Sequence, residues 1–398
     1  MTTLATTSDA DIMTDATPPA GGTSGATLRL RDLHTTFSSR GLTVHAVRGV
    51  DLDLHPGEIT VLLGESGSGK SVTAKSIMRL YGANATFAGT VELDGRGDLL
   101  AAGPKEMLSV RGPEIALIPQ DPSAALDPLR RIGAQIVEVL RQHKAVPSRA
   151  AAKARALELL GQVGIPDPAR VYRSFPHELS GGMRQRAVIA IAVSCDPKVL
   201  IADEPTTALD VTVQAQILAL FRSLIDRMGS AVLLVTHDVG VAEEVGDRIG
   251  VMYAGRIVEY GPAADVLGDP RHPYTRALLD SIPTPGVERG QLRSITGQPP
   301  VSGELPPGCA FAPRCPEAHD RCRATDPVLV DLPGRRLAAC HLLTDDPDAP
   351  AGPGDPTDAG AAGPTGGPGG PDGPVDAAGP TDETPVEAPA PAGEESAA

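Results

Sequence analysis

Hydrophobic and polar residues alternate early in the chain. Residues 28–33 and 43–54, the latter reading TVHAVRGVDLDL, show the period of two that is typical of half-buried antiparallel strands. EITVLLG at 58–64 is a continuous apolar run that ends at glycine, which indicates a strand buried on both faces. Residues 90–95 and 115–120 are further strand candidates.

The pattern becomes helical after these strands. Residues 131–194 carry helical spacing, and no strand candidate interrupts them. Buried-strand composition returns at 198–203 and 231–236, with an amphipathic helix between the two that ends at a glycine. RIGVMYAGRIVEYG at 248–261 predicts a hairpin, and from about residue 262 the chain is rich in proline. The order predicts an α/β core that is interrupted by a helical insertion.

Acidic residues gather at the two ends of the chain. Of the 50 Asp and Glu residues, 15 lie in residues 1–26 and 345–398, and these segments contain no Lys or Arg. The interior therefore has 35 acidic residues against 35 Lys and Arg, so its charge does not point to nucleic acid as a partner. The ends have too little apolar surface to offset the entropy of ordering, and we expect disordered acidic tails that aid solubility or bind a partner.

The cellular compartment decides how the cysteines are used. The N-terminal residues lack the basic and apolar regions of a signal peptide. The longest apolar run, AVIAIAVSC, is half of the roughly 18 residues that a membrane span needs. We therefore expect a cytosolic chain, in which thiols stay reduced.

A phosphate-binding loop follows the strand at 58–64. GESGSGKS at 64–71 matches the pattern G-x-x-x-x-G-K-[ST] between a predicted strand and a predicted helix. Its glycines let backbone N–H groups turn toward phosphate oxygens, and the helix N-terminus adds its dipole. Lys70 is expected at the β- and γ-phosphates, and the Ser71 hydroxyl at Mg²⁺. The predicted nucleotide-binding residues are Gly64, Glu65, Ser66, Gly67, Ser68, Gly69, Lys70 and Ser71.

Two adjacent carboxylates complete the predicted site. The buried strand in VLIADE at 199–204 ends at Asp203 and Glu204. Asp203 is expected to hold Mg²⁺, and Glu204 to polarise the water that attacks the γ-phosphate. Adjacent acids also occur at ordinary strand ends, so the indication depends on the phosphate-binding loop.

Further motifs resemble those of ATP-binding cassette (ABC) ATPases. LSGGMRQR at 179–186 resembles the signature motif of the family, and IPQDP resembles its Q-loop. TALD at 207–210 resembles the D-loop, and the histidine after AVLLVT resembles the switch histidine. An aromatic residue in TTFSS is the candidate that stacks on adenine. By this resemblance Glu204, His237 and Gln120 are catalytic, Ser71, Gln120 and Asp203 hold Mg²⁺, and Phe37, Ser180, Gly181, Gly182 and Asp210 bind nucleotide.

The resemblance can be narrowed to one group. Four segments are similar to segments of the ATPase subunits of oligopeptide and dipeptide importers: QDPSAALDP, SGGMRQRAVIAIA, HPYTRALLDSIP and LPPGCAFAPRCP. Some relatives in this group import nickel. The group implies a P-loop ABC ATPase core with an antiparallel β-subdomain and a helical subdomain, plus a small cysteine-containing extension. The implied division is a tail at 1–26, the ATPase domain at 27–261 with the helical subdomain at about 121–194, the extension at 262–344, and a tail at 345–398.

The resemblance also implies a mechanism and partners. Two cassettes would dimerise with two ATP molecules between them, so that Ser180 and Gly182 of one chain contact the γ-phosphate held by the other. The second cassette would be a related subunit or a copy of this chain. Both would act on two transmembrane permease subunits, at the cytoplasmic face of the membrane, with an extracytoplasmic binding protein supplying the substrate.

Other classes of function stay open from the sequence. The chain has one P-loop, one signature and no extended heptads, which disfavours a soluble ABC ATPase of repair or translation. A cassette that binds ATP without hydrolysis and only regulates its partner is disfavoured because Glu204 and His237 are both present.

Four of the five cysteines lie close together near the C-terminus, in the order Cys309-x5-Cys315-x6-Cys322-x17-Cys340. In a reducing compartment they indicate a metal rather than disulfides. Four thiolates suit Zn²⁺ or an iron–sulfur cluster, and the lack of a close pair favours the cluster. The resemblance implies a [4Fe–4S] cluster, since some importers of this group have one. Packing of reduced thiols is the alternative for these four and the expected role of Cys195, while His319 and His341 lie near enough to replace a ligand.

Overall fold

The computed structural model describes residues 25–39, 42–207, 209–281, 295–300 and 305–344. The expected tail at 345–398 and residues 1–24 of the other expected tail lie outside this part. None of the helices in the described part is long and apolar enough to cross a membrane.

The smaller of two sheets is antiparallel, with the strand order β2-β1-β4-β5. β1 is longer than the alternation at 28–33 predicts, because the ladder continues past an irregularity between Leu30 and Leu33, where Asp32 has a φ of 49°. This irregularity breaks the period of two in the sequence while the strand goes on. The four strands are β1 (Leu28–Ser39), β2 (Leu42–Leu54), β4 (Ala85–Leu93) and β5 (Gly97–Asp98).

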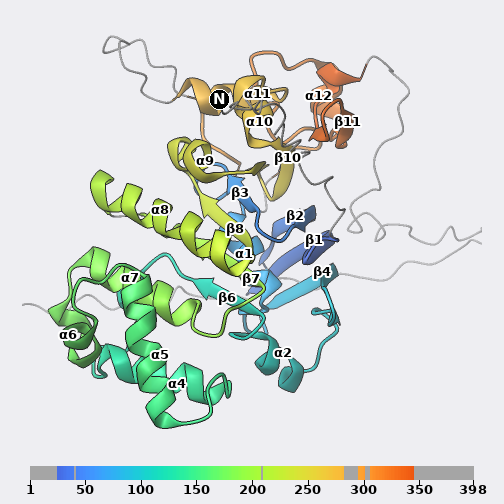
Figure 1. The fold of residues 1–398 in the computed structure, drawn as a ribbon. Helices are drawn as coiled ribbons and strands as arrows, with labels where there is room; N and C mark the ends of the chain where they lie inside the picture. Colours follow the sequence, from blue (N-terminus) through green and yellow to red (C-terminus); the bar gives the residue numbers. More distant parts are fainter. Residues whose placement is uncertain (1–24, 40–41, 208, 282–294, 301–304, 345–398) are drawn as a thin grey trace, which may run out of the picture. The chain divides into compact units, whose positions relative to one another are not determined.

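The larger sheet has the order β11-β12-β10-β9-β3-β8-β7-β6 (Figure 1). Its centre is parallel, since β6 pairs with β7, β7 with β8, β8 with β3, and β3 with β9. β9 and β10 form the predicted hairpin. The strands are β3 (Ile59–Leu63), β6 (Ile115–Ile118), β7 (Val199–Asp203), β8 (Ala231–Thr236), β9 (Arg248–Tyr253), β10 (Arg256–Pro262), β11 (Val330–Leu332) and β12 (Arg336–Ala338).

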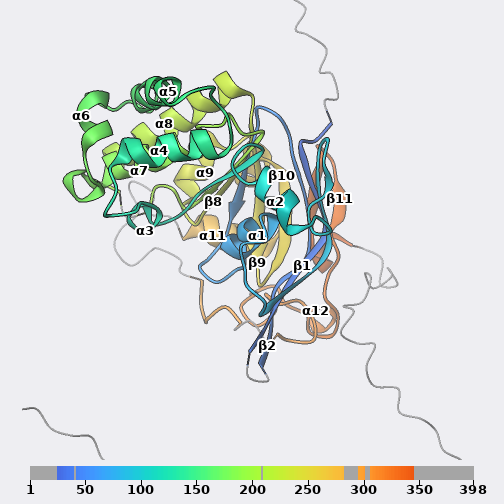
Figure 2. The same cartoon turned by 90° about the horizontal axis from the view of Figure 1, so that it is seen from below.

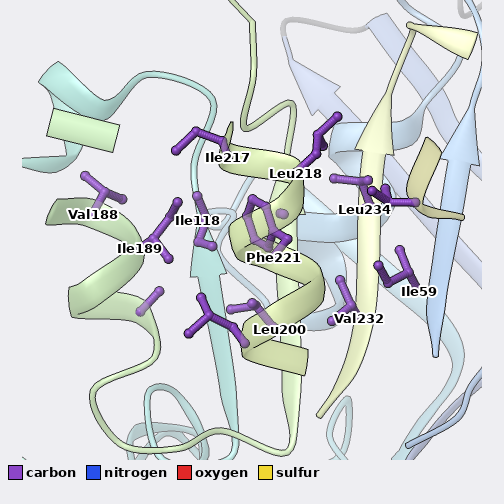
Figure 3. Packing of buried hydrophobic residues seen from close by; sticks show 14 of the residues in the cluster. Ile59, Ile118, Val188, Ile189, Leu200, Ile217, Leu218, Phe221, Val232 and Leu234 are labelled. Atoms are coloured by element: carbon purple, nitrogen blue, oxygen red, sulfur yellow. The ribbon is translucent and has the colours of Figure 1, made fainter. Parts of the chain in front are cut away.

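Successive residues of the central strands point into two different cores. In β7, Leu200 belongs to a cluster that includes Ile189 and Phe221, while Val199 belongs to a second cluster that includes Leu30. The first core packs the sheet against helices (Figure 3), and the second packs its other face against the antiparallel sheet. Both faces are therefore apolar, which accounts for the continuous apolar runs of β3, β7 and β8.

Helices cover both cores. Residues of α1 and α2 pack in the second core, and residues of α8 and α9 in the first. α8 ends as predicted, at Gly229 in a left-handed conformation. These helices are α1 (Lys70–Ile77), α2 (Pro104–Val110), α8 (Val211–Met228) and α9 (Val239–Val245).

The stretch between β6 and β7 is helical, as its periodicity predicts. Polar side chains set the starts of four of its helices: Asp121, Ser148, Asp167 and Ser180 accept hydrogen bonds from N–H groups of the first turn. Figure 2 shows these helices gathered beside one another. They are α3 (Pro122–Ala125), α4 (Ile132–Gln142), α5 (Arg149–Gln162), α6 (Pro168–Arg173), the 3₁₀ turn at Pro176–Glu178 and α7 (Gly181–Ala192).

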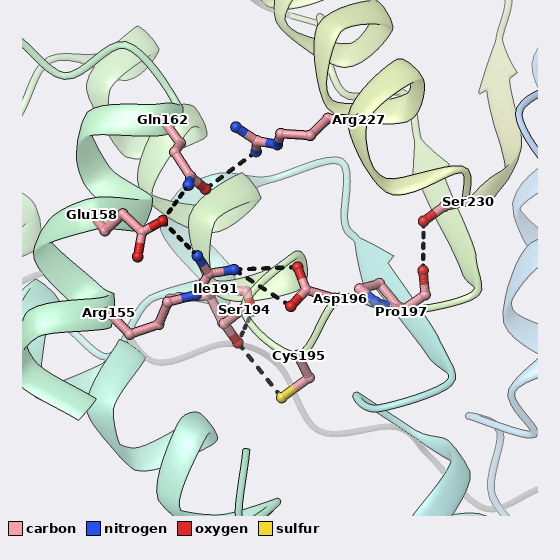
Figure 4. Close-up of polar contacts among 10 residues, drawn as sticks. All are labelled: Arg155, Glu158, Gln162, Ile191, Ser194, Cys195, Asp196, Pro197, Arg227 and Ser230. Carbon is pink, nitrogen blue, oxygen red and sulfur yellow. Dashed lines mark hydrogen bonds and ion pairs between the residues drawn. The ribbon is translucent and has the colours of Figure 1, made fainter. Parts of the chain in front are cut away.

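The turn from α7 to β7 contains the fifth cysteine (Figure 4). Cys195 is half-buried, and its sulfur lies 3.8 Å from the Ser194 hydroxyl. Burial raises the pKa of this thiol. The neighbouring Asp196 accepts from Arg155 of α5 at 3.2 Å, which ties the turn to the helical subdomain.

The segment after residue 262 continues the larger sheet. β12 pairs with β10, and β11 pairs with β12. A buried ion pair joins the two parts, because the Arg336 guanidinium donates to Glu259 of β10 at 3.0 Å and the two side chains are 7% and 0% exposed. The other elements here are α10 (Ala263–Gly268), α11 (Pro273–Asp280), α12 (Asp320–Ala324) and the 3₁₀ turn at His341–Leu343.

We predict that Arg336→Ala lowers the free energy of unfolding by about 3–5 kcal/mol, because it leaves the Glu259 carboxylate buried without its counter-charge. Arg31→Ala is the matched control, since Arg31 pairs with Asp53 at an exposed site and should cost about 1 kcal/mol or less. Urea unfolding of the three proteins measures both values. Equal losses of unfolding free energy in the two variants would contradict the stabilising role of the buried Arg336–Glu259 ion pair.

Candidate active site

The phosphate-binding loop connects β3 to α1 through glycines that no other residue can replace. Gly64 and Gly69 have φ values of 155° and 107°. A Cβ on Gly64 would lie 2.3 Å from the carbonyl oxygen of Met252, and one on Gly69 would lie 2.6 Å from that of Ala46. The loop is therefore packed directly against the backbone of two other strands.

Lys70 is buried at the start of α1. Its Nζ donates to the carbonyl oxygens of Gly64 and Glu65, at 2.8 and 2.9 Å. Burial lowers the pKa of this ammonium group, while the negative charges of Glu204, Asp203 and Glu65 act in the opposite direction. The lysine charge thus lies among the carboxylates of the site.

The loop meets the second predicted motif through a short contact. The Ser71 hydroxyl donates to Oδ1 of Asp203 at 2.6 Å. Asp203 is fully buried at the end of β7. Its other oxygen lies 3.2 Å from Nζ of Lys75, one turn along α1. A serine hydroxyl beside a buried carboxylate is a donor set that suits Mg²⁺.

Three sequence-predicted catalytic residues come together at Glu204. Its Oε2 accepts from Nε2 of Gln120 at 2.8 Å, and its Oε1 lies 3.1 Å from Nδ1 of His237. A third partner, Thr207, donates its hydroxyl to Oε2 at 2.9 Å. The Glu204 carboxylate is thus held by side chains that follow three different strands.

The environment of Glu204 keeps its carboxylate charged. Burial by itself would raise the pKa, but the hydrogen bonds from His237 and Thr207 lower it below its usual value. The charges of His237 and Lys70 act in the same direction. The residue also has a φ of 50°, a strained conformation for a side chain of this size.

The signature and D-loop residues have partners outside this group. Ser180 caps α7 and accepts from the N–H of Met183, and Gly182 lies against Val213 of α8. Asp210 caps α8. These residues therefore lie at helix N-termini, where N–H groups favour a bound anion.

The candidate adenine-stacking residue packs beside another aromatic ring. Phe37, in β1, makes an edge-on contact with Tyr81, with 4.9 Å between ring centroids. Tyr81 follows α1, and burial raises its pKa to about 12.

Sequence reasoning missed two polar partners in the site. Thr207 lies within TALD, but its contact with Glu204 depends on the turn after β7. Lys75 stands four residues after Ser71 in the predicted helix, and this helical spacing was the available signal for its contact with Asp203.

The four C-terminal cysteines converge on one small cavity. Cys309, Cys315, Cys322 and Cys340 line it with Phe311 and His341. Burial raises the pKa of Cys309 to about 12 and that of Cys340 to about 11. Across the residues that the structure describes, no three His, Cys, Asp or Glu side chains are placed as ligands of a metal ion. The described structure therefore brings the four thiols to one cavity without arranging them as a metal site.

Comparisons with known proteins agree with this geometry. Residues 47–207 match the ABC transporter family, and residues 258–322 match the C-terminal region of oligopeptide/dipeptide transporters. The dipeptide transport ATP-binding protein of Bacillus subtilis (strain 168) is 48% identical over 303 residues, which are 74% of this chain and 88% of that protein. An oligopeptide transport ATP-binding protein of the same strain is 44% identical over 321 residues, 80% and 97% of the two chains.

A solved structure shares the fold. The dimeric ATP-binding cassette in a post-hydrolysis state, bound to ADP and Pi, aligns with a TM-score of 0.54 and 29% identity, over 59% of this chain and 98% of that one. The motifs, the two family matches and the relatives lead to one assignment. The chain belongs to the ATP-hydrolysing subunits of ABC transporters, in the group that carries the oligopeptide/dipeptide C-terminal region.

Proposed function

We propose that this chain hydrolyses ATP to drive the import of peptides. The observation that supports hydrolysis is the set of contacts around Glu204, which joins the Q-loop and switch positions next to a complete phosphate-binding loop. Peptide as substrate is supported by the relatives, which are named as dipeptide and oligopeptide transport proteins. A nickel or other solute importer is the second candidate, because the substrate-selecting partners are other chains.

Glu204 acts as the general base in this proposal. Its lowered pKa keeps the carboxylate ionised at neutral pH, so it can accept the proton of the attacking water. His237 is 56% exposed, which leaves its ring open to a γ-phosphate while one nitrogen contacts Glu204. Gln120 completes the support of the carboxylate, and orients it toward the site.

The phosphates of ATP bind to the phosphate-binding loop and to the start of α1 in this proposal. Lys70 and the backbone N–H groups of the loop hold the β- and γ-phosphates, with Ser71 and Asp203 as the residues that would hold Mg²⁺. The metal, when bound, neutralises charge that develops on the phosphate oxygens. Phe37 is the residue proposed to contact adenine.

Two cassettes are proposed to act as a pair. The signature and D-loop residues lie at the N-termini of α7 and α8, and the contacts given for them do not involve this chain's own phosphate-binding loop: Ser180, Gly181, Gly182 and Asp210. A helix N-terminus suits a bound phosphate, here the γ-phosphate held by a partner cassette. The partner is a related subunit or a second copy of this chain. ATP closes the pair and hydrolysis reopens it, because ATP binds the closed state more tightly.

The motion reaches the membrane through the helical subdomain. Gln120 directly precedes this subdomain and contacts Glu204, so it couples the catalytic carboxylate to α3–α7. Two transmembrane permease subunits receive the motion, and an extracytoplasmic binding protein delivers the substrate. The chain would therefore work at the cytoplasmic face of the membrane.

The four C-terminal cysteines are proposed to hold a [4Fe–4S] cluster, with Zn²⁺ as the alternative. Their convergence on one cavity supports a shared ligand, and thiolates suit either group. Burial raises the pKa values of Cys309 and Cys340, so these two thiols are costly to ionise, and a bound metal would offset that cost. The group, when bound, would hold the extension together.

We predict that Glu204→Gln lowers steady-state ATP turnover of the assembled transporter by about 100-fold or more, because the amide cannot accept the proton of water. Equilibrium binding of ATP should be retained. Glu244→Gln is the matched control, since Glu244 is an exposed glutamate of α9 and its substitution should leave turnover unchanged. ATP turnover at the wild-type rate in a pair of cassettes that both carry Glu204→Gln would rule out Glu204 as the general base.

The transport function is tested with the chain, its permease subunits and its binding protein reconstituted in vesicles. We expect short peptides to stimulate ATP hydrolysis and to accumulate inside the vesicles. Stimulation of ATP hydrolysis by Ni²⁺ and not by peptides would show that nickel, and not peptide, is the transported substrate. ATP binding without hydrolysis, with or without peptide, would favour a regulatory cassette.

Purification without oxygen tests the cysteine proposal. We expect brown protein that contains iron and sulfide, and Cys322→Ser should lose both. Cys195→Ser is the control, because Cys195 lies in the turn after α7 and should leave the iron content unchanged. Stoichiometric zinc without iron would establish the alternative metal. Four titratable thiols without any metal would leave packing as their role.

A further inference from the structure

Glu65, the second residue of the phosphate-binding loop, is held by residues from the far end of the chain. Its backbone N–H donates to the Tyr274 hydroxyl of α11 at 2.9 Å. Both terminal nitrogens of Arg314 donate to its carboxylate, at 2.7 and 3.0 Å. Arg314 stands 249 residues downstream, within the sequence of the cysteine-containing extension. The extension therefore reaches the loop that binds nucleotide.

Arg314 is fixed on every side. Its side chain is 4% exposed, its Nε donates to the carbonyl oxygen of Thr296 at 3.1 Å, and Nη1 lies 3.3 Å from the Tyr253 hydroxyl. Tyr253, Tyr274 and Phe311 pack against one another around it. A planar guanidinium held this way presents two parallel donors to one carboxylate with little freedom to turn.

Glu65 lies beside the lysine of the loop, because the Lys70 Nζ donates to the Glu65 carbonyl oxygen at 2.9 Å. The negative charge of its carboxylate also acts on that ammonium, the group proposed to bind the β- and γ-phosphates. A phosphate at Lys70 would therefore bind in the field of the same carboxylate. Without a counter-charge, that carboxylate would repel the phosphate and compete with it for Lys70.

We propose that Arg314 is a positioning residue for ATP: it neutralises Glu65 and fixes the phosphate-binding loop, so that the loop offers ATP a net positive site. The inference rests on the proposed ATP hydrolysis and adds a residue outside the cassette motifs to it. Arg314 directly precedes Cys315, which lines the cysteine cavity. The contact between the extension and the loop is thus linked to the affinity of the loop for ATP through one side chain.

The test is equilibrium binding of MgATP to the full chain. Arg314→Ala should weaken binding about tenfold or more, the size expected of one uncompensated charge a few ångströms away. Arg314→Lys keeps the charge but loses the paired donors, and should bind with intermediate affinity. The double variant Arg314→Ala/Glu65→Gln should regain most of the affinity, because the repelling carboxylate is gone.

Two controls separate this role from a structural one. Arg276→Ala removes an exposed ion pair of the same extension with Glu317, and should leave affinity unchanged. Arg336→Ala destabilises the extension without touching the loop, so thermal unfolding should shift while ATP affinity stays near that of the wild type.

The outcomes are distinct. Wild-type affinity in Arg314→Ala overturns the inference, and so does a double variant that binds no better than Arg314→Ala. Equal losses in Arg336→Ala and Arg314→Ala would also overturn it, because stability alone would then explain both. If the wild-type chain does not bind ATP, the result would instead contradict the proposed function.

Discussion

The parallel pairing at the centre of the larger sheet brings the proposed catalytic groups to one edge. Leu63 of β3 lies opposite Thr236 of β8, Asp203 of β7 opposite Val235, and Ile118 of β6 opposite Ala202. Because these strands end in register, the residues that follow them emerge side by side. The phosphate loop, Glu204, His237 and Gln120 therefore meet without any of them being adjacent in the chain.

That register holds because both faces of the strands are buried. A slip by one residue would exchange the side chains of the two cores, and move every proposed catalytic group away from its partner. The cores thus do more than stabilise the sheet. They fix which residue stands at the end of each strand, and so allow Glu204 to keep its strained φ of 50° within a set of hydrogen bonds.

The C-terminal extension is part of the same structural unit as the cassette. β12 continues the larger sheet, Phe311 packs in the first core, and Arg314 reaches the phosphate loop. A proline-rich segment with few apolar residues gains its stability by using the core of its neighbour. One aromatic contact joins the two sites, because Phe311 lines the cysteine cavity and packs on Tyr274, whose hydroxyl accepts from the Glu65 N–H of the loop.

The sequence by itself determined the local features of this protein. The apolar runs predicted the buried strands. The candidate site residues came from GESGSGKS, the Asp203–Glu204 pair and LSGGMRQR, because each of these motifs depends on neighbours in the chain. β11 and β12 escaped prediction, since three-residue strands carry too little pattern to recognise. Only the tertiary structure decided that Lys75 contacts Asp203 and that Arg314 pairs with Glu65. Such contacts follow from how distant elements pack, and a pairing across 249 residues leaves no periodicity or spacing in the sequence from which it could be inferred.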